Sequence, residues 1–308
     1  MTKHATPPQE ALDLTPLAGR IGAEIRGLSL APGLDATILR ALRDALTRYK
    51  VLFFRAQHHV DGTVQQDFSR AWGEPVGHPT APGQKDEYLL ELSAAHGGKA
   101  NVWHTDMTFL SDYPSVSILR AVDIPPVGGD TVWANTASAY AHLPPALRRL
   151  ADELWAVHSN DYDYSVNQTG SDQAVDAYHA AFVSSIFEAE HPLVRLHPLS
   201  GEKSLVLGGF FKKFSGLSQT ESRHLFDIFQ AHVTRLENTV RWRWNRGDVV
   251  IWDNQSTQHY AIDDYGDYPR VVQRMTLRGG PATAVDGRRS RQILPATNPA
   301  GHATGNAD

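Results

Sequence analysis

The order in which helical and strand-like segments follow one another limits the fold of this chain more than any other feature. Helical patterns come early, at 34–50 and 61–73, whereas strand-like runs dominate the centre and the end. Three of these runs, "TVRWRW", "DVVIWDN" and "RVVQRMTLRG", follow one another between residues 239 and 279. A fold that alternates strands with crossover helices would need the two kinds of segment to be interleaved. We therefore predict an α+β fold whose core is a β-rich barrel or sandwich, with helices packed outside it.

Local signals mark where several of the helices begin. Asp35 is a suitable N-cap for the first of them. Ser218 and Glu221 have the spacing of a capping box. Pro144 and Pro145 mark the start of the helix predicted from residue 145. The first turn of a helix tolerates proline, because the N–H group that proline lacks would be unpaired there anyway. The predicted helices are 34–50, 61–73, 145–159 and 218–237.

The length of 308 residues fits one large domain, and the composition of the two ends separates them from it. We predict a loose N-terminus over 1–12, a single domain over 13–285 and a flexible tail over 286–308. The tail is rich in Pro, Gly, Asn and Ala and has no hydrophobic period. Residues 160–190 are polar, with a weak helical pattern in the middle, and we predict that they form a lid.

Composition excludes several kinds of protein. The net charge of -5 argues against a nucleic-acid-binding protein, which usually carries a basic surplus. No cysteine is present, so disulfides and thiolate metal sites are excluded, and any metal must be held by His, Asp or Glu. The first residues do not resemble a signal peptide, and no run of about 18 apolar residues offers a membrane span. We therefore expect a protein of the cytoplasm that does not contact membranes.

A candidate metal site begins in "NVWHTDMTFL", residues 101–110, where His104 and Asp106 stand two apart. With 15 His and 34 acidic residues, about one or two such pairs are expected by chance. His59 and Asp61 form another pair of this kind, but Asp61 precedes a helix and is explained as its N-cap. In a strand, side chains two apart point to the same face. If 101–110 is a strand, His104 and Asp106 can both reach one ion.

The best candidate for a third ligand is His259, which follows the strand "DVVIW". Two histidines and one carboxylate form the facial triad of Fe(II) oxygenases, which leaves open positions on the iron for substrate and oxygen. A histidine in such a place is, taken alone, more often a surface or core residue. The metal site therefore depends on what else the sequence places beside it.

The segment "RVVQRMTLRG" supplies a candidate anion pocket soon after His259. Its alternation puts Arg270, Arg274 and Arg278 on one strand face and a mostly apolar set on the other. One interpretation is that the arginines face water while the apolar side faces the core. The other is that two of them line a pocket, because a guanidinium binds a carboxylate or sulfate through paired hydrogen bonds. Thr131 could add a hydroxyl donor to such a carboxylate.

Taken together, these segments resemble the TauD/TfdA (taurine dioxygenase) family of Fe(II)/2-oxoglutarate-dependent dioxygenases. The matching pieces are "WHTDMTF", "GGDTVWAN", "GDVVIWDNQSTQHYA" and "PRVVQR", and ten residues separate His259 from Arg270, as in the family. The resemblance runs from about residue 14 to 285. It implies a double-stranded β-helix (jelly-roll) core, with iron on His104, Asp106 and His259. It also implies 2-oxoglutarate on Arg270 and Thr131, with O2 as the second co-substrate.

Within that family the sequence is most similar to the alkylsulfate dioxygenases, also called alkylsulfatases, through pieces such as "GEPVGHPT" and "HVTRLENTVRWRW". This likeness implies hydroxylation of the carbon next to the sulfate ester of an alkyl sulfate, which gives an aldehyde, sulfate, succinate and CO2. It places His78 and Arg274 at the sulfate. It further implies a homodimer or homotetramer that acts on a small anionic organic substrate.

Several positions depart from the taurine dioxygenase pattern and point to a less polar substrate. Ala100 and Ala81 stand where taurine dioxygenases have Asn and Tyr. Met107 replaces the usual Val beside the sulfur group, and Phe210 could form an apolar wall for the substrate or simply pack in the core. Gln255 replaces an Arg that is common in the "WDNR" motif. A sulfonate or carboxylate substrate stays open as an alternative, as does a metal-binding barrel without enzymatic activity.

Overall fold

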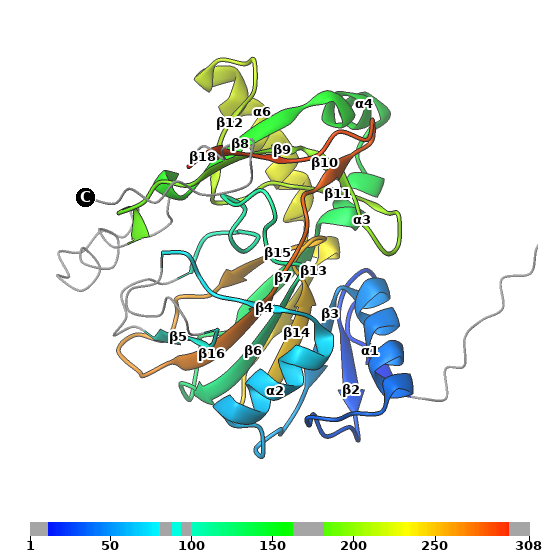
Figure 1. Ribbon diagram of the computed structural model, residues 1–308, viewed down its shortest axis with the longest axis vertical. Coiled ribbons are helices and arrows are strands. Elements are labelled where there is room, and N and C mark those ends of the chain that lie inside the picture. Colours follow the sequence, from blue (N-terminus) through cyan, green and yellow to red (C-terminus); the bar gives the residue numbers. More distant parts are fainter. Residues whose placement is uncertain (1–11, 81–87, 94–99, 163–181, 296–308) are drawn as a thin grey trace, which may run out of the picture.

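The computed structural model describes residues 12–80, 88–93, 100–162 and 182–295, in which two β-sheets form the core (Figure 1). The larger sheet has eight strands in the order β1-β2-β3-β14-β6-β16-β4, with β5 also paired to β16. Its strands are β1 (Asp13–Pro16), β2 (Ala23–Arg26), β3 (Val51–Phe54), β4 (Pro75–Val76), β5 (Leu90–Ser93), β6 (Val116–Asp123), β14 (Val249–Asp253) and β16 (Val271–Leu277). The smaller sheet has the antiparallel order β13-β7-β15 and consists of β7 (Thr131–Asn135), β13 (Thr239–Trp242) and β15 (Thr257–Ala261).

Aromatic side chains hold these two sheets against each other. Trp133 of β7 contacts Phe53 of β3 and Trp252 of β14, with ring centroids 5.5 and 5.8 Å away. Trp242 of β13 stacks on Phe53 at 4.3 Å. All four rings are buried in one apolar cluster, and removing such large apolar surfaces from water is a main stabilising contribution to a sandwich of sheets. The predicted β-rich core is confirmed, and its two facing sheets form the jelly-roll arrangement.

Two helices, α1 (Ala36–Tyr49) and α2 (Gly62–Trp72), cover the outer face of the larger sheet (Figure 1). Asp35 caps α1 by accepting a 2.7 Å hydrogen bond from a backbone N–H of the first turn, and Asp61 caps α2 in the same way at 2.8 Å. Asp61 therefore has the structural role that was predicted for it. Nε2 of His59 lies 2.8 Å from the Leu30 carbonyl oxygen, so this histidine also has a structural contact of its own.

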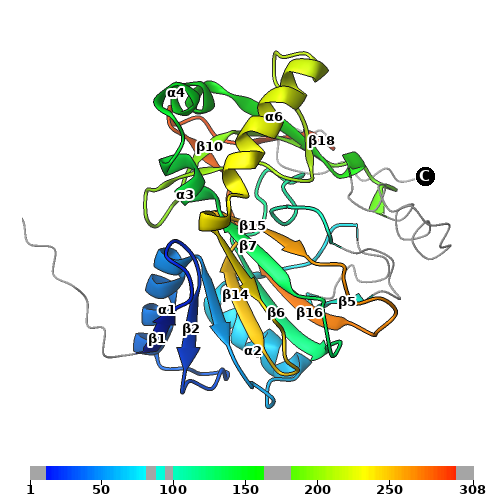
Figure 2. The same cartoon turned by 180° about the vertical axis from the view of Figure 1, so that it is seen from behind.

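A second group of elements lies beyond one end of the sandwich, at the top of Figures 1 and 2. Its helices are α3 (Thr136–Ala141), α4 (Pro145–Glu153) and α6 (Gln219–Val233), with 3-10 turns η3 (Asn160–Tyr162) and η5 (Leu236–Asn238). One sheet has the order β12-β8-β9-β18, from β8 (Trp155–Ser159), β9 (Glu188–Pro192), β12 (Phe211–Phe214) and β18 (Arg291–Leu294). The other has the order β11-β10-β17, from β10 (Val194–Leu196), β11 (Lys203–Leu205) and β17 (Thr283–Ala284). Ser218 and Glu221 form the predicted capping box at the start of α6.

Two predicted segments differ in the structure. The helix predicted over 145–159 ends at Glu153, and the residues that follow Leu154 form β8, because they pair with β9 on one side and β12 on the other. The flexible tail predicted from residue 286 is wrong for Arg291–Leu294, which pairs with β9 as strand β18. Both errors have the same cause: pairing between strands that are distant in sequence leaves little trace in the local pattern.

The other segments predicted to be loose lie largely outside the described residues. Of the predicted lid over 160–190, residues 163–181 are among those not described, as are 1–11 and 296–308 of the two ends. For residues 163–181 the lid therefore stays a prediction. It is wrong for residues 188–190, which lie in strand β9 and pair with β8 and β18. No helix among the described residues is long and apolar enough to cross a lipid bilayer.

Candidate active site

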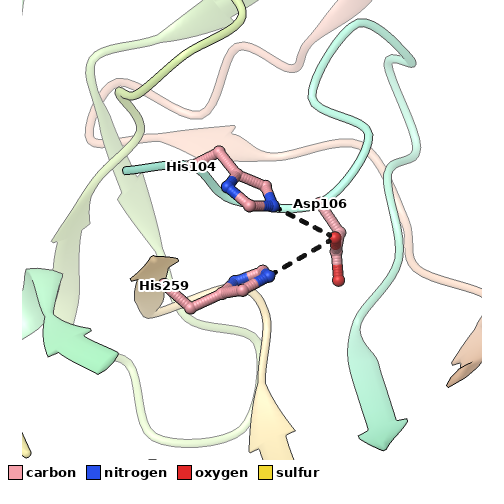
Figure 3. Close-up of side chains that lie close together, drawn as sticks. All are labelled: His104, Asp106 and His259. Carbon is pink, nitrogen blue, oxygen red and sulfur yellow. Dashed lines mark ion pairs between the residues drawn. The ribbon is translucent and has the colours of Figure 1, made fainter. Parts of the chain in front are cut away.

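Two histidines and an aspartate converge in a buried cluster. Figure 3 shows the side chains of His104, Asp106 and His259, with Oδ1 of Asp106 lying 3.7 Å from Nε2 of each histidine. One potential ligand atom from each residue lies within 4.8 Å of the others, and none of the three residues has more than 6% of its surface exposed. The structure thus brings together the three residues that the sequence predicted as metal ligands.

Backbone pairing sets the two histidines side by side. His259 lies on β15, and His104 forms an isolated antiparallel bridge with it. The bridge has two hydrogen bonds, from His104 N to His259 O at 3.0 Å and from His259 N to His104 O at 2.8 Å. Residues that lie directly opposite each other in an antiparallel pair have neighbouring side chains. The ring centroids are accordingly 4.1 Å apart, and both imidazoles face the same space.

Residues 101–110 do not form the strand that would put His104 and Asp106 on one face. His104 makes a single bridge, and the chain turns from Asp106 onward, with a hydrogen bond from Leu110 N to Met107 O at 3.0 Å. Met107 has a φ of 53°, a left-handed conformation that is uncommon for a non-glycine residue. The aspartate therefore meets the histidines because of this turn, and not because two residues of one strand share a face.

Asp106 is held by two residues for which the sequence predicted no role, Asn254 and Ser117. Asn254 accepts a hydrogen bond from Asp106 N at 2.9 Å and donates one to the Asp106 carbonyl at 3.2 Å. Ser117 donates to Oδ2 of Asp106 at 2.8 Å, so that Oδ1 faces the histidines. His104 is oriented similarly, since its Nδ1 lies 2.7 Å from the Val102 carbonyl oxygen. Contacts of this kind fix ligands around metal ions. Serine and asparagine are so common, however, that their positions in the sequence do not predict such contacts.

The protonation states of the cluster suit a metal cation. Burial lowers the pKa of His259 well below its ordinary value of 6.5, and it also lowers the pKa of His104. Both rings are therefore neutral at neutral pH, as metal ligands must be. Burial alone would raise the pKa of Asp106, but the positive charge of Arg274 and the hydrogen bond from Ser117 bring it to about 2. Two neutral imidazoles and one carboxylate are the donor set that holds Fe(II) while leaving positions open, so the residues present fit this ion.

Arg270 is a buried cation that forms no ion pair within the described parts of the chain. Only 9% of its surface is exposed. Its Nε donates to the Gly129 carbonyl at 2.9 Å, and its Nη2 donates to Thr131 Oγ1 at 3.4 Å. The nearby carboxylate of Asp130 pairs with Arg241 instead, at 2.7 Å. A buried charge is unfavourable unless an opposite charge accompanies it, so this pocket is suited to a bound carboxylate.

The arginines of β16 and its flanks do not share one environment. Arg274 is 9% exposed and donates from Nη1 to Oδ1 of Asp106 at 2.5 Å. Arg278 is exposed and pairs with Glu74 at 2.8 Å. The interpretation in which the arginines face water is therefore wrong for Arg270 and Arg274 and correct for Arg278. The guanidinium groups of Arg270 and Arg274 are thus shielded from solvent and can bind an anion inside the protein.

Apolar side chains lie next to the metal cluster. Met107 and Phe210, which were predicted to contact substrate, pack with Phe109 and Phe182 in one buried group. The ring centroid of Phe210 lies 6.2 Å from that of His104, and the rings of Phe109 and Phe210 are in edge contact at 5.0 Å. This apolar group gives the site one wall without hydrogen-bonding side chains.

His78 adjoins this apolar group, with its ring centroid 5.6 Å from that of Phe182. Burial, followed by the charge of Arg274, lowers the pKa of His78 to about 3. His78 is therefore neutral at neutral pH and can offer a hydrogen bond, but no charge, to a bound anion. Ala81, the other position taken from this part of the sequence, lies outside the described residues.

Known proteins share both the sequence and the fold of this chain. The model of the family described as "Taurine catabolism dioxygenase TauD, TfdA family" matches residues 13–276. The alpha-ketoglutarate-dependent sulfate ester dioxygenase of Pseudomonas putida is 56% identical over 282 residues, which cover 91% of this chain and 94% of that protein. The alkylsulfatase of Acinetobacter baylyi is 50% identical over 297 residues, which cover 96% of this chain and 94% of that protein. A crystal structure of a taurine dioxygenase from Burkholderia xenovorans matches with a TM-score of 0.78 and 36% identity, over 93% of this chain and 96% of that one.

The fold and the cluster thus define a jelly-roll protein with two histidines and a carboxylate at its centre. The chain belongs to the TauD/TfdA family, and it is an oxidoreductase of the dioxygenase type. The predicted family and the predicted fold are both confirmed.

Proposed function

We propose that this protein is an Fe(II)- and 2-oxoglutarate-dependent dioxygenase that oxidises alkyl sulfates. In the overall reaction an alkyl sulfate, 2-oxoglutarate and O2 become an aldehyde, sulfate, succinate and CO2. The observation that carries the proposal is a pair of buried arginines: Arg274 contacts the histidine–aspartate cluster directly, and Arg270 forms no ion pair in the described residues. Relatives named for sulfate esters and alkyl sulfates are 56% and 50% identical to this chain.

Each part of the site has a role in this reaction. Bound to His104, Asp106 and His259, Fe(II) supplies the redox chemistry between O2 and the two organic substrates. Arg270 and Thr131 bind the carboxylate of 2-oxoglutarate that is remote from its 2-oxo group. The apolar wall beside the cluster excludes water and accepts the alkyl chain.

Arg274 and His78 fix the sulfate in this proposal. Their hydrogen bonds hold the anionic head group, and the carbon that bears the sulfate ester is thereby aimed at the metal. Positioning of this kind can account for a large share of a rate enhancement. Because His78 is neutral, Arg274 supplies the charge that recognises the sulfate.

An alkyl chain suits the apolar wall better than the short, cationic chain of taurine does. Met107, Phe109, Phe182 and Phe210 are all at most 4% exposed, and none of these side chains offers a strong acceptor to an ammonium group. Arg274 alone does not decide the head group, because a guanidinium also binds sulfonates and carboxylates through paired hydrogen bonds. Sulfonates and aryloxyalkanoates are therefore the alternatives to exclude.

A panel of substrates with matched chain lengths tests the proposal. The purified protein receives Fe(II), ascorbate, 2-oxoglutarate and O2 together with an alkyl sulfate, an alkyl sulfonate or an aryloxyalkanoate, and succinate, sulfate and sulfite are measured. We expect the alkyl sulfate to give succinate and sulfate in equal amounts and at the highest rate. Faster turnover of the sulfonate or the aryloxyalkanoate would reassign the substrate. No succinate from any substrate would favour a metal-binding barrel without enzymatic activity.

Two further expectations concern the protein as a whole. We expect a homodimer or homotetramer, which light scattering on the purified protein measures. We also expect the protein in the cytoplasm, and cell fractionation checks this location.

A further inference from the structure

The hydroxyl of Thr131 receives hydrogen bonds from two donors. Nε1 of Trp244 donates to Thr131 Oγ1 at 2.9 Å, and Nη2 of Arg270 donates to the same atom at the longer distance of 3.4 Å. An indole N–H and a guanidinium can only donate, whereas a hydroxyl has two lone pairs and one proton. Both lone pairs are therefore engaged, and the one remaining direction of this hydroxyl is that of its proton.

Nothing in the described residues accepts that proton. Thr131 is 2% exposed, so its hydroxyl proton is shielded from bulk water, and the guanidinium of Arg270 lies next to the hydroxyl. A buried donor without an acceptor is unfavourable, because it has lost its hydrogen bond to water. The Arg270 guanidinium thus lacks an anionic partner, and the neighbouring Thr131 hydroxyl lacks an acceptor for its proton. One bound carboxylate would supply both.

The two tryptophans of "RWRW" have different partners. Trp242 stacks on Phe53, and its Nε1 donates to Oδ2 of Asp248 at 3.2 Å. Trp244 is 3% exposed, packs in the same apolar cluster, and turns its Nε1 to Thr131. The indole of Trp244 therefore packs in the core between the sheets and, through its N–H group, also contacts Thr131 of the proposed anion site.

Arg270 is prealigned by its own contact. Its Nε donates to the carbonyl of Gly129, which has a φ of 70°. A Cβ at this position would lie 3.1 Å from Cδ of Arg270 and 3.0 Å from Cγ of Pro125, so the close approach of the backbone to the guanidinium requires a glycine here. Both donors to an incoming carboxylate are thus oriented before it arrives.

We infer that Trp244 is a positioning residue for 2-oxoglutarate: by occupying one lone pair of Thr131, its indole N–H directs the Thr131 hydroxyl proton at the carboxylate that Arg270 binds. This inference rests on the proposed function. Without the indole N–H, the hydroxyl can rotate and its proton is no longer directed. The loss corresponds to about one neutral hydrogen bond, so we expect about three- to tenfold weaker binding of 2-oxoglutarate.

A double-mutant cycle tests the inference by calorimetric titration of 2-oxoglutarate into the Fe(II)-loaded protein without oxygen, which measures binding and not turnover. We expect Trp244→Phe to raise the dissociation constant about three- to tenfold, and Trp242→Phe, the matched control, to change it less than about twofold. In the Thr131→Val background, Trp244→Phe should have no further effect, whereas Thr131→Ser should bind like the wild type. An unchanged constant in Trp244→Phe, or an equal loss with and without the Thr131 hydroxyl, would overturn the inference.

Arg270→Ala separates this inference from the function on which it rests. If Arg270→Ala leaves 2-oxoglutarate binding unchanged, the proposed co-substrate pocket itself is wrong. If Arg270→Ala weakens binding and Trp244→Phe does not, only the role of Trp244 is refuted.

A second measurement decides the question if Trp244→Phe does not fold. The indole N–H resonance of Trp244 is followed by 15N NMR in the Zn(II)-loaded protein, which is diamagnetic, while 2-oxoglutarate is added. We expect this resonance to shift in the wild type and to stay in place in Thr131→Val. No shift in the wild type, or the same shift in both proteins, would contradict the inference.

Discussion

Arg274 and Asp106 form a buried ion pair, with Nη1 of the arginine 2.5 Å from Oδ1 of the aspartate. The same oxygen lies 3.7 Å from Nε2 of His104 and of His259. The proposed substrate-binding cation is thus joined to a proposed metal ligand. Nε of Arg274 has no hydrogen-bond partner in the described residues. The guanidinium can therefore hold Asp106 and still donate to a substrate anion, because its N–H groups lie in a fixed fork.

Loss of either histidine from the cluster should abolish metal-dependent activity. In His104→Ala or His259→Ala one of three ligands is gone, and we expect Fe(II) affinity to fall by at least about 100-fold, since changes to residues that merely support ligands already cost 10- to 100-fold. Metal content and Fe(II) titration measure this loss. His59→Ala is the control, because His59 stands in the other His-x-Asp pair and contacts Leu30 instead. Retention of Fe(II) binding in both cluster variants would refute the metal site.

Removal of the Arg270 side chain should weaken the binding of 2-oxoglutarate. A hydrogen-bonded charge pair contributes about 1.5–3 kcal/mol, so the dissociation constant of Arg270→Ala should rise about 10- to 150-fold. Arg278→Ala controls for a lost arginine at the end of the same strand. It breaks an exposed pair with Glu74, and such pairs contribute at most about 1 kcal/mol. Equal affinities in the two variants would refute the pocket.

Arg274→Ala should affect the sulfate substrate and spare 2-oxoglutarate. The KM for an alkyl sulfate should rise, and more succinate than sulfate should form, because the substrate is no longer aimed while 2-oxoglutarate still binds. Initial rates and the ratio of succinate to sulfate measure both effects. The opposite pattern, weak 2-oxoglutarate binding with an unchanged KM for the sulfate, would exchange the roles assigned to Arg274 and Arg270.

Acid should destabilise the fold through buried neutral histidines outside the metal cluster. Burial lowers the pKa of His191 to about 4, and its ring is hydrogen-bonded to Ser290 and to the Thr108 carbonyl, at 2.7 Å each. Below about pH 6.5 the unfolded chain binds a proton at this histidine and the folded chain does not, so the free energy of unfolding falls as pH falls from about 6.5 to about 4, by about 1.4 kcal/mol per pH unit. Urea unfolding of the metal-free protein at several pH values measures this slope. His191→Gln should have the shallower slope, and equal slopes would contradict the assignment.

Much of the site could be predicted because its chemistry is local in the sequence. His104 and Asp106 stand in one short segment, and His259 and Arg270 stand in another, with ten residues between them. The capping box at Ser218 likewise depends on neighbours only. Such features follow from residue types and spacing. The structure brings His104, Asp106 and His259 together, although a turn and not a strand carries Asp106 there.

What could not be predicted depends on contacts between distant segments. The turn at Asp106 is held by Asn254, which lies 148 positions further along the chain. Arg274 looks like Arg278 in an alternating strand, and only the tertiary structure buries one and exposes the other. The hydrogen bond between Trp244 and Thr131 spans 113 positions and leaves no local pattern. In each case a side chain acquires its role from a partner that the local sequence does not identify.

The products formed from one alkyl sulfate test the central claim most directly. The purified Fe(II) protein is incubated with hexyl sulfate, with and without 2-oxoglutarate and O2, and aldehyde, alcohol, sulfate and succinate are quantified, with His104→Ala as the inactive control. We predict aldehyde, sulfate and succinate in equal amounts, and only when both co-substrates are present. Sulfate released together with the alcohol, independently of 2-oxoglutarate and O2, would identify a hydrolase and contradict the account.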